Sequence, residues 1–229
     1  MRTLIVTAVP AERDAVVAAC PDAVGAPGGI DVLAVGVGPA AAAARTALAL
    51  ARDPGGRPYG LVVSAGIGGG FPPLAPVGSV AVSSEIVAAD LGAETPGGPQ
   101  PFTSVTDLGF GTTVHRPPEA LARAVAEAAG AAYGPVLTVS TATGTAERAA
   151  LLARRHPGAL AEAMEGFGVA EAAAACGVPA LEVRTVSNAV GPRDRAAWRI
   201  AEALEALTSA FGQIVPALDG WRDRAPSPR

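Results

Sequence analysis

The stretch AEAMEGFGVAEAAAACGVPALEVRTVSNAVGPRDR, residues 161–195, decides the fold. It predicts a β–α–β unit, in which a short run leads to Glu165, an alanine-rich helix follows, and a strand over 180–186 ends beside Asn188. In open parallel sheets, ligands bind at the carboxyl ends of the strands. We therefore expect Glu165 and Asn188 to face one crevice from neighbouring strands, with Arg184 slightly earlier on its strand.

Glu165 and a second glutamate, Glu12, both stand at predicted strand-to-helix junctions. Glu12 follows an apolar strand over 4–8 and Pro10, which suits the first position of a helix that continues to residue 19. A carboxylate in the first turn of a helix complements the helix dipole, which is a purely structural interpretation of both residues. The functional interpretation is that both carboxylates point into the ligand crevice. The local pattern leaves both interpretations open.

Composition favours one large α/β domain. The 229 residues fit one domain better than two and suffice for a sizeable core. Aromatic residues make up only 4% of the chain, so small apolar side chains must let the layers approach closely. The net charge of −4 gives no basic footprint for nucleic acid. We expect the domain over 1–218 and a frayed polar tail over 219–229.

The cysteines and the first residues bear on where the protein works. Cys20 and Cys176 lack the spacing of a metal or redox motif, which favours a reduced cytoplasmic setting and no metal. The apolar run over 4–9 is too short for a signal peptide or a membrane span. We therefore expect a soluble cytoplasmic protein without a membrane partner.

Glycines follow two further predicted strands. After the strand over 31–37, Gly36 and Gly38 come near the dinucleotide-binding spacing, but the next predicted strand, over 61–65, lacks the acidic residue that this motif needs. We therefore expect no NAD and no other cofactor. The segment Gly66–Gly70 is predicted to be a loop whose backbone lies close to a ligand.

The remaining segments continue the α/β pattern. The long stretch over 91–116 has little periodicity and is predicted to be a lid or binding loop, with His115 as a solvated residue at its end. Strands are expected over 79–89 and 135–140, and helices over 118–129, 146–155 and 195–218. The last helix carries an apolar stripe that we expect in the core, namely Trp198, Ile200, Leu204, Leu207 and Phe211.

Together these segments resemble the nucleoside phosphorylase/nucleosidase superfamily, most closely its bacterial nucleosidases, from residue 1 to about 218. The resemblance implies a single three-layer α/β/α domain with a central mixed, twisted sheet, which assembles into a homodimer or a higher homo-oligomer. This chain departs from the family pattern at two positions. Ala163 stands where the family has a glutamate, and Asn188 stands where the family has the aspartate that protonates the purine. The matching segments are Glu12 after the first strand, Gly66–Gly70, Val77-Gly78-Ser79, Ala163-Met164-Glu165 and the strand that ends in Val183–Asn188.

The segment 190–195, with Trp198, resembles the futalosine hydrolase branch, which cleaves hypoxanthine from futalosine on a menaquinone pathway. This resemblance implies that Glu12 activates water as a general base, that Glu165 accepts hydrogen bonds from the ribose hydroxyls, and that Met164 packs beneath the sugar. Arg184 is expected to hold Glu12 or the water. Neither a metal nor a cofactor is implied. Further substrate contacts are expected from Gly66, Ile67, Thr143, Gly144, Ser187 and Arg193.

Asn188 predicts which purine base is released. A side-chain amide cannot deliver a proton at neutral pH. A 6-oxopurine presents two acceptors, O6 and N7, which match an amide NH₂, whereas an aspartic acid suits a 6-aminopurine. We therefore expect hypoxanthine to be preferred over adenine. The proton for N7 comes from water or from Asp194, and the sequence leaves both open.

The group beside the nucleophile decides between hydrolysis and phosphorolysis. A phosphate dianion needs arginines around it, whereas Glu12 would repel it and Gly66–Gly70 contains no basic residue. Water is therefore the expected nucleophile. The carboxylate at the 5′ end of futalosine is expected to meet Arg193, Arg116 or the loop 91–113 of a partner subunit.

Other functions remain open on the sequence alone. The chemistry also allows a methylthioadenosine, adenosylhomocysteine or aminofutalosine nucleosidase, or an inosine phosphorylase. A purine-nucleoside binding protein without activity is possible on the same fold, because a fold does not fix a function.

Overall fold

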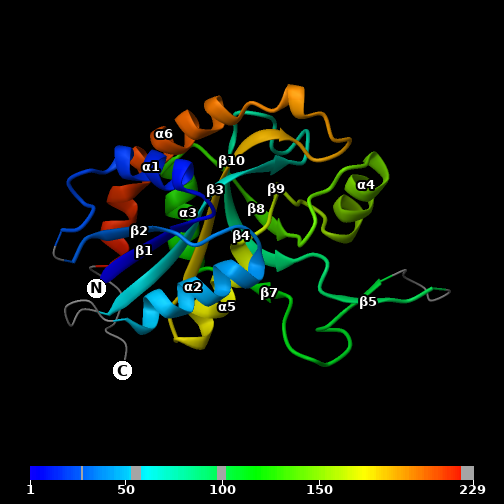
Figure 1. Ribbon diagram of the computed structural model, residues 1–229, viewed down its shortest axis with the longest axis horizontal. Helices are drawn as coiled ribbons and strands as arrows, with labels where there is room; N and C mark the ends of the chain where they lie inside the picture. Colours follow the sequence, from blue (N-terminus) through cyan, green and yellow to red (C-terminus); the bar gives the residue numbers. More distant parts are fainter. Residues whose placement is uncertain (27, 53–57, 97–101, 223–229) are drawn as a thin grey trace.

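The structure is a computed structural model that describes residues 1–26, 28–52, 58–96 and 102–222 (Figure 1). The strands are β1 (Arg2–Thr7), β2 (Ile30–Ala34), β3 (Tyr59–Gly70), β4 (Val80–Ala88), β5 (Gly92–Glu94), β6 (Phe102–Ser104), β7 (Val114–His115), β8 (Ala132–Thr138), β9 (Ala161–Ala163) and β10 (Ala180–Ala189). The helices are α1 (Pro10–Ala19), α2 (Pro39–Ala51), α3 (Glu119–Ala128), α4 (Ala146–Arg155), α5 (Gly166–Ala175), the 3₁₀ turn η1 (Arg195–Ala197) and α6 (Ile200–Arg222).

The main sheet is mixed and partly closed on itself. Its strands follow the order β10-β4-β8-β9-β3-β1-β2, and β10 also pairs with β3. The strands from β10 to β3 therefore form a ring, from which β1 and β2 extend as a parallel flank. The predicted central mixed sheet is confirmed, and its closure is a feature that the chain order did not indicate.

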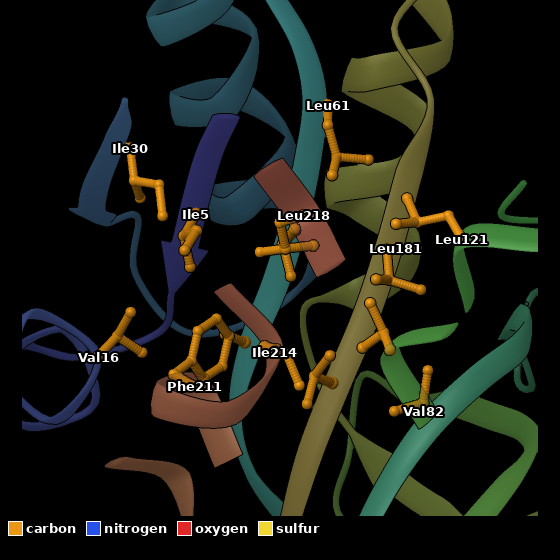
Figure 2. Packing of buried hydrophobic residues seen from close by; sticks show 14 of the residues in the cluster. Ile5, Val16, Ile30, Leu61, Val82, Leu121, Leu181, Phe211, Ile214 and Leu218 are labelled. Atoms are coloured by element: carbon orange, nitrogen blue, oxygen red, sulfur yellow. The ribbon is translucent and has the colours of Figure 1, made fainter. Parts of the chain in front are cut away.

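Helices cover both faces of this sheet, which gives the predicted three layers (Figure 1). On one face α6 packs against α1 and α3, and on the other α2 packs against α5. The larger core lies under α6, where Phe211, Ile214 and Leu218 meet Ile5 of β1 and Leu181 of β10 (Figure 2). All five side chains are fully buried, so they anchor α6 to the strands that carry the site.

The glycine segment is part of a strand, so the prediction that Gly66–Gly70 is a loop is wrong. Strand β3 runs through it and pairs in parallel with β10, with Arg184 opposite Gly66 and Asn188 opposite Gly69. Glycines are poor strand formers and favour the prediction of a break. Here they stay in the sheet because other chain segments press against them: a Cβ at Gly68 would lie 2.8 Å from the backbone oxygen of Glu162.

The segment over 91–116 also differs from expectation. The predicted loop over 91–116 contains the two-stranded pair β5–β6 and the short strand β7, which joins β4; residues 97–101 of it lie outside the described residues. His115 is on β7 and bonds to Glu171 over 3.0 Å, so it is not a solvated loop residue. It also contacts the ring of Phe167.

The last helix is shifted towards the C-terminus. Its start moves from Arg195 to Ile200, and it continues to Arg222, beyond the predicted end at Leu218. Trp198 therefore lies before the helix and is half-buried, while Ile200 is exposed, so neither belongs to the core. Residues 223–229 of the predicted tail lie outside the described residues. Within the described part of the chain, no helix has the length and apolar character that a membrane span needs.

Candidate functional site

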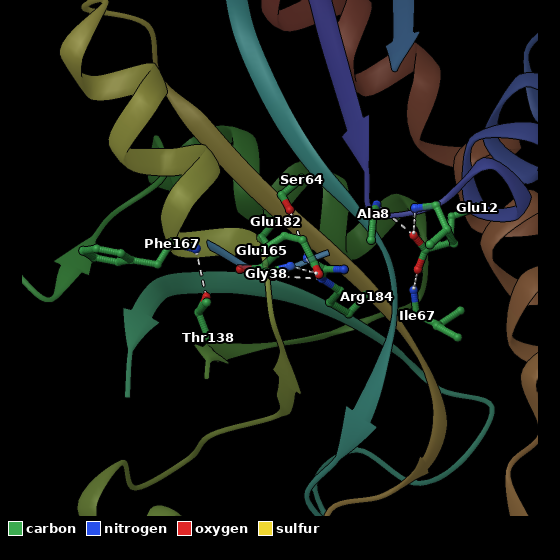
Figure 3. A network of polar contacts seen from close by, with 11 residues as sticks. Ala8, Glu12, Gly38, Ser64, Ile67, Thr138, Glu165, Phe167, Glu182 and Arg184 are labelled. Carbon is green, nitrogen blue, oxygen red and sulfur yellow. Dashed lines mark hydrogen bonds and ion pairs between the residues drawn. The ribbon is translucent and has the colours of Figure 1, made fainter. Parts of the chain in front are cut away.

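Glu12 links the start of α1 to β3. Its Oε2 accepts hydrogen bonds from the backbone N–H groups of Ala8 at 2.9 Å and Val9 at 3.2 Å, and its Oε1 accepts one from Ile67 at 2.9 Å (Figure 3). Only 3% of the residue is exposed. One oxygen therefore binds the backbone at the helix start, and the other binds the backbone of the glycine segment.

Glu165 lies between β9 and α5, but its side chain does not cap the helix. Oε1 accepts a hydrogen bond from the backbone of Gly38 at 3.2 Å, and Oε2 lies 3.3 Å from Nη2 of Arg184. Gly38 has φ of 91°, a conformation that favours glycine, and it delivers its N–H from the start of α2. The interpretation of Glu165 as a side-chain cap of its own helix is therefore wrong, because its carboxylate binds distant parts of the chain instead.

Arg184 is the centre of the buried polar network (Figure 3). Its Nε donates to Glu182 at 2.8 Å, and Nη2 donates to Ser64 at 3.0 Å and also lies beside Glu165. Burial by itself lowers the pKa of Arg184, but the carboxylates of Glu182, Glu165 and Glu12 outweigh burial and raise it. Arg184 is therefore a permanent cation among three carboxylates.

Gly66 separates Glu12 from Arg184. A Cβ at this position would lie 2.5 Å from Oε1 of Glu12 and 2.7 Å from Nη1 of Arg184. Both groups therefore lie so close to Gly66 that no side chain fits at this position. This carboxylate and this guanidinium therefore lie close to each other across Gly66.

We expect Gly66→Ala to lower kcat/KM for the hydrolysis that the sequence predicts by about 10²-fold. The added methyl group must displace Glu12 or Arg184, and a small displacement of a group that positions the reactants lowers the rate by about that factor. Steady-state kinetics of the variant measure the loss. Gly78→Ala is the control, since a Cβ there meets no atom within 4 Å. Gly78 has φ of 87°, so this control is compared at equal folded fraction, measured by urea denaturation. Equal kcat/KM for the Gly66 variant and the wild type would show that the close packing of Glu12 and Arg184 against Gly66 does not affect the reaction.

Asn188 stands on the other side of β3 from Glu165. It pairs with Gly69, while β9, which leads to Glu165, pairs with β3 along its opposite edge. The two residues therefore flank one strand, and the prediction that they come from neighbouring strands is wrong. The amide is half-buried: Oδ1 accepts from the Ser187 hydroxyl at 2.8 Å, and Nδ2 donates to the oxygen of Ala189 at 3.0 Å. Among the residues that the structure describes, the second N–H of this amide donates to no group, so it can serve an acceptor on a ligand.

The other predicted contact residues are gathered less tightly. Thr143 donates its N–H (2.7 Å) and its hydroxyl (2.5 Å) to Glu162, and the oxygen of Gly144 accepts from the backbone of Arg193 at 3.2 Å. This ties the segment after β8 to the segment after β10. Met164 is half-buried beside Glu165.

Asp194 is less well suited to supply a proton than the sequence allowed. It is exposed, and its Oδ1 accepts a hydrogen bond from Ala196 at 3.0 Å, which starts η1. Among the arginines considered for a 5′ carboxylate, Arg116 already pairs with Glu85 at 2.6 Å. Arg193 is exposed.

Sequence reasoning missed two buried glutamates. Glu182 is fully buried on β10 beside Arg184, and Glu162 is buried on β9 under Thr143. Burial raises the pKa of both carboxyl groups, opposed by Arg184 at Glu182 and by the Thr143 hydrogen bonds at Glu162. A charged residue inside the apolar run of 180–186, two positions before Arg184, was the available signal for Glu182.

Two cavities in the described part of the chain lie away from the candidate residues. Within the described ranges, a cavity of about 560 Å³ lies under β6 and α4, and another of about 560 Å³ beside β2 and α2. Neither is lined by Glu12, Glu165 or Asn188. No group of three or more His, Cys, Asp or Glu residues in the described part of the chain is placed to hold a metal ion.

Comparisons with known proteins identify the family of this chain. Residues 15–218 match the family model described as the phosphorylase superfamily. A futalosine hydrolase of Streptomyces coelicolor is 64% identical over 97% of this chain and 98% of its own length. A futalosine hydrolase of Acidothermus cellulolyticus is 46% identical over 93% of this chain and 90% of its own length.

Solved structures support the fold. A methylthioadenosine/adenosylhomocysteine nucleosidase of Colwellia psychrerythraea, in complex with adenine, superposes with a TM-score of 0.76. It covers 96% of this chain and 95% of its own chain at 23% identity. At that identity the likeness concerns the fold alone.

Proposed function

Because this chain belongs to the phosphorylase superfamily, we propose that it hydrolyses the N-ribosidic bond of futalosine and releases hypoxanthine and dehypoxanthine futalosine. The observation that carries this proposal is the buried network in which Glu12, Glu165 and Arg184 meet at the glycines of β3. The names and coverage of the two futalosine hydrolase relatives support the choice of substrate.

Glu12 is the general base in this proposal. The oxygen of a water molecule bonds to C1′ of the ribose while the C1′–N9 bond breaks. The electron pair of the C1′–N9 bond leaves with the purine. The transition state resembles an oxocarbenium ion, as in glycoside hydrolysis. Oε1 of Glu12, which lies beside Gly66, takes the proton of the water.

Glu165 and Arg184 position the sugar and the nucleophile. Glu165 accepts hydrogen bonds from the ribose hydroxyls, and Met164 packs beneath the ring. Arg184 holds Glu165 through Nη2, and its Nη1 orients the water opposite Glu12.

Asn188 selects the base. The Ser187 hydroxyl donates to Oδ1 and so turns the NH₂ group of the amide towards acceptors. O6 and N7 of hypoxanthine are acceptors, whereas adenine presents an amino group at the position of O6. The leaving purine takes its N7 proton from water, which agrees with the use of Asp194 as the start of η1.

The test is a chromatographic assay of the purified protein with futalosine, aminofutalosine, inosine and methylthioadenosine, with and without phosphate. We expect hypoxanthine from futalosine at a rate that does not depend on phosphate. Adenine release alone would assign a methylthioadenosine or aminofutalosine nucleosidase, and phosphate-dependent turnover of inosine would assign a phosphorylase. Binding of nucleosides without any turnover would assign a purine-nucleoside binding protein.

We also propose a homodimer or a higher homo-oligomer that works in the cytoplasm. The segment after β6 presents Leu108 and Phe110 to solvent, and Phe110 is 78% exposed, which suits burial against a second copy. The two cysteines are free, which suits a reducing compartment. The exposed Arg193, or the 91–113 segment of a partner subunit, then meets the 5′ carboxylate of futalosine.

A further inference from the structure

Glu182 is a buried carboxyl group that the mechanism above does not use. It lies on β10, its side chain is fully buried, and its backbone N–H donates to the hydroxyl of Ser83 at 3.0 Å. Oε1 accepts the Nε–H of Arg184 at 2.8 Å. Burying a charged group is costly, so a carboxyl group at this depth needs an explanation beyond packing.

The start of α5 leaves room for this carboxyl group. Gly166 is the first residue of α5, and a Cβ there would collide with both oxygens of Glu182. The residue that follows Glu165 must therefore lack a side chain, because the carboxyl group of Glu182 fills the place of its Cβ. Within the described residues, Oε2 of Glu182 is buried there without a hydrogen-bond partner. Glu182 therefore touches the Glu165 region twice, through Arg184 and through the backbone of α5.

We propose that Glu182 is a positioning residue for hydrolysis, which fixes the guanidinium of Arg184 so that Glu165 and the water are held in line. The proposal deepens the proposed function and rests on it. The guanidinium is planar, so a hydrogen bond at Nε sets the direction of both Nη groups. With Nε held by Glu182, Nη2 points at Ser64 and Glu165, and Nη1 lies beside Gly66, close to Glu12.

Charge supports the same role. Arg184 is one cation among Glu12, Glu165 and Glu182. Without Glu182, the guanidinium is drawn to the two catalytic carboxylates alone and competes with the substrate and the water for them. Glu182 thus keeps Arg184 from pairing too closely with the groups that must bind the ribose and take the proton.

The main test variant is Glu182→Met, which fills the space but removes the acceptor for Nε. We expect kcat/KM for hypoxanthine release from futalosine to fall by about 10²-fold, mostly in kcat, because the catalytic groups lose their alignment. Glu182→Gln keeps an acceptor oxygen and should recover part of this loss. The matched control is Thr185→Val on the same strand, a fully buried polar side chain that bonds to Ala203 of α6 instead of Arg184. It should keep kcat/KM near the wild-type value.

A double-mutant cycle with Glu165→Gln separates positioning from stability. If Glu182 acts through Glu165, combining Glu182→Met with Glu165→Gln should lose little beyond Glu165→Gln alone. Additive losses, or a Glu182→Met variant that behaves like Thr185→Val, would overturn the proposal. Should Glu182→Met fail to fold, the same cycle with Glu182→Gln decides by the same criterion. A wild-type protein that releases no hypoxanthine would instead refute the proposed function.

Discussion

Glu12→Gln is expected to lower kcat for hypoxanthine release by roughly 10²–10⁴-fold, the usual contribution of a general base, while substrate affinity stays close to that of the wild type. The amide keeps an oxygen that can accept the N–H of Ile67 but cannot take a proton from water. Its NH₂ group then faces the N–H donors of Ala8 and Val9, so the variant should also lose about 1–3 kcal/mol of stability. Steady-state kinetics, calorimetric binding of futalosine and urea denaturation measure the three quantities.

Glu147→Gln is the matched control, because Glu147 also lies in the first turn of a helix but is exposed on α4. This variant should keep both kcat and stability. A Glu12→Gln enzyme that retains wild-type kcat would show that another group activates the water. Loss of binding together with turnover would instead give Glu12 a role in holding the substrate.

Asn188→Asp is expected to reverse the preference for the base. The NH₂ donor becomes a carboxyl group that accepts from a 6-amino group, so hypoxanthine release falls and adenine release from aminofutalosine rises. Sites built on matched hydrogen bonds can discriminate by about 10⁴-fold, which bounds the change in the ratio of kcat/KM values. The Ser187 hydroxyl can still donate to the new carboxylate, whereas the hydrogen bond from Nδ2 to the oxygen of Ala189 is lost.

The measurement is kcat/KM for futalosine and for aminofutalosine, which differ only at C6 of the purine. Asp194→Asn is the accompanying control, and it should leave the ratio unchanged because Asp194 is exposed and bonded to Ala196. An unchanged ratio in Asn188→Asp would show that another group reads C6. A large loss in Asp194→Asn would make Asp194 the source of the N7 proton.

The order of elements could be read from the chain because local patterns carry it. The buried apolar strands, Pro10 and Pro39 at helix starts, and Thr145 before α4 all act within a few residues. Thr145 is the N-cap of α4, and its side chain accepts a hydrogen bond from the backbone of Arg148 at 3.2 Å. The prediction failed where long-range contacts override local preference, as in β3, where β10 and β9 keep glycines inside a sheet.

The candidate residues were recognisable from their types, but their partners were not. Glu12, Glu165 and Arg184 stand at predicted strand ends or on the predicted strand, so the sequence marked them. Nothing local joins Glu165 to Gly38 or Arg184 to Ser64, because these pairs are far apart along the chain. Glu182 looked like an ordinary strand residue until its burial beside Arg184 was visible.

The sequence by itself therefore determined the α/β order and which side chains could take a proton or read a keto-purine, since residue chemistry and short-range periodicity are written locally. The tertiary structure alone decided that the sheet closes through the pairing of β3 with β10. It also brought three acidic side chains into electrostatic interaction with one buried arginine, Arg184. The physical reason is that strand pairing and the neutralisation of buried charge depend on residues brought together only when the whole chain packs.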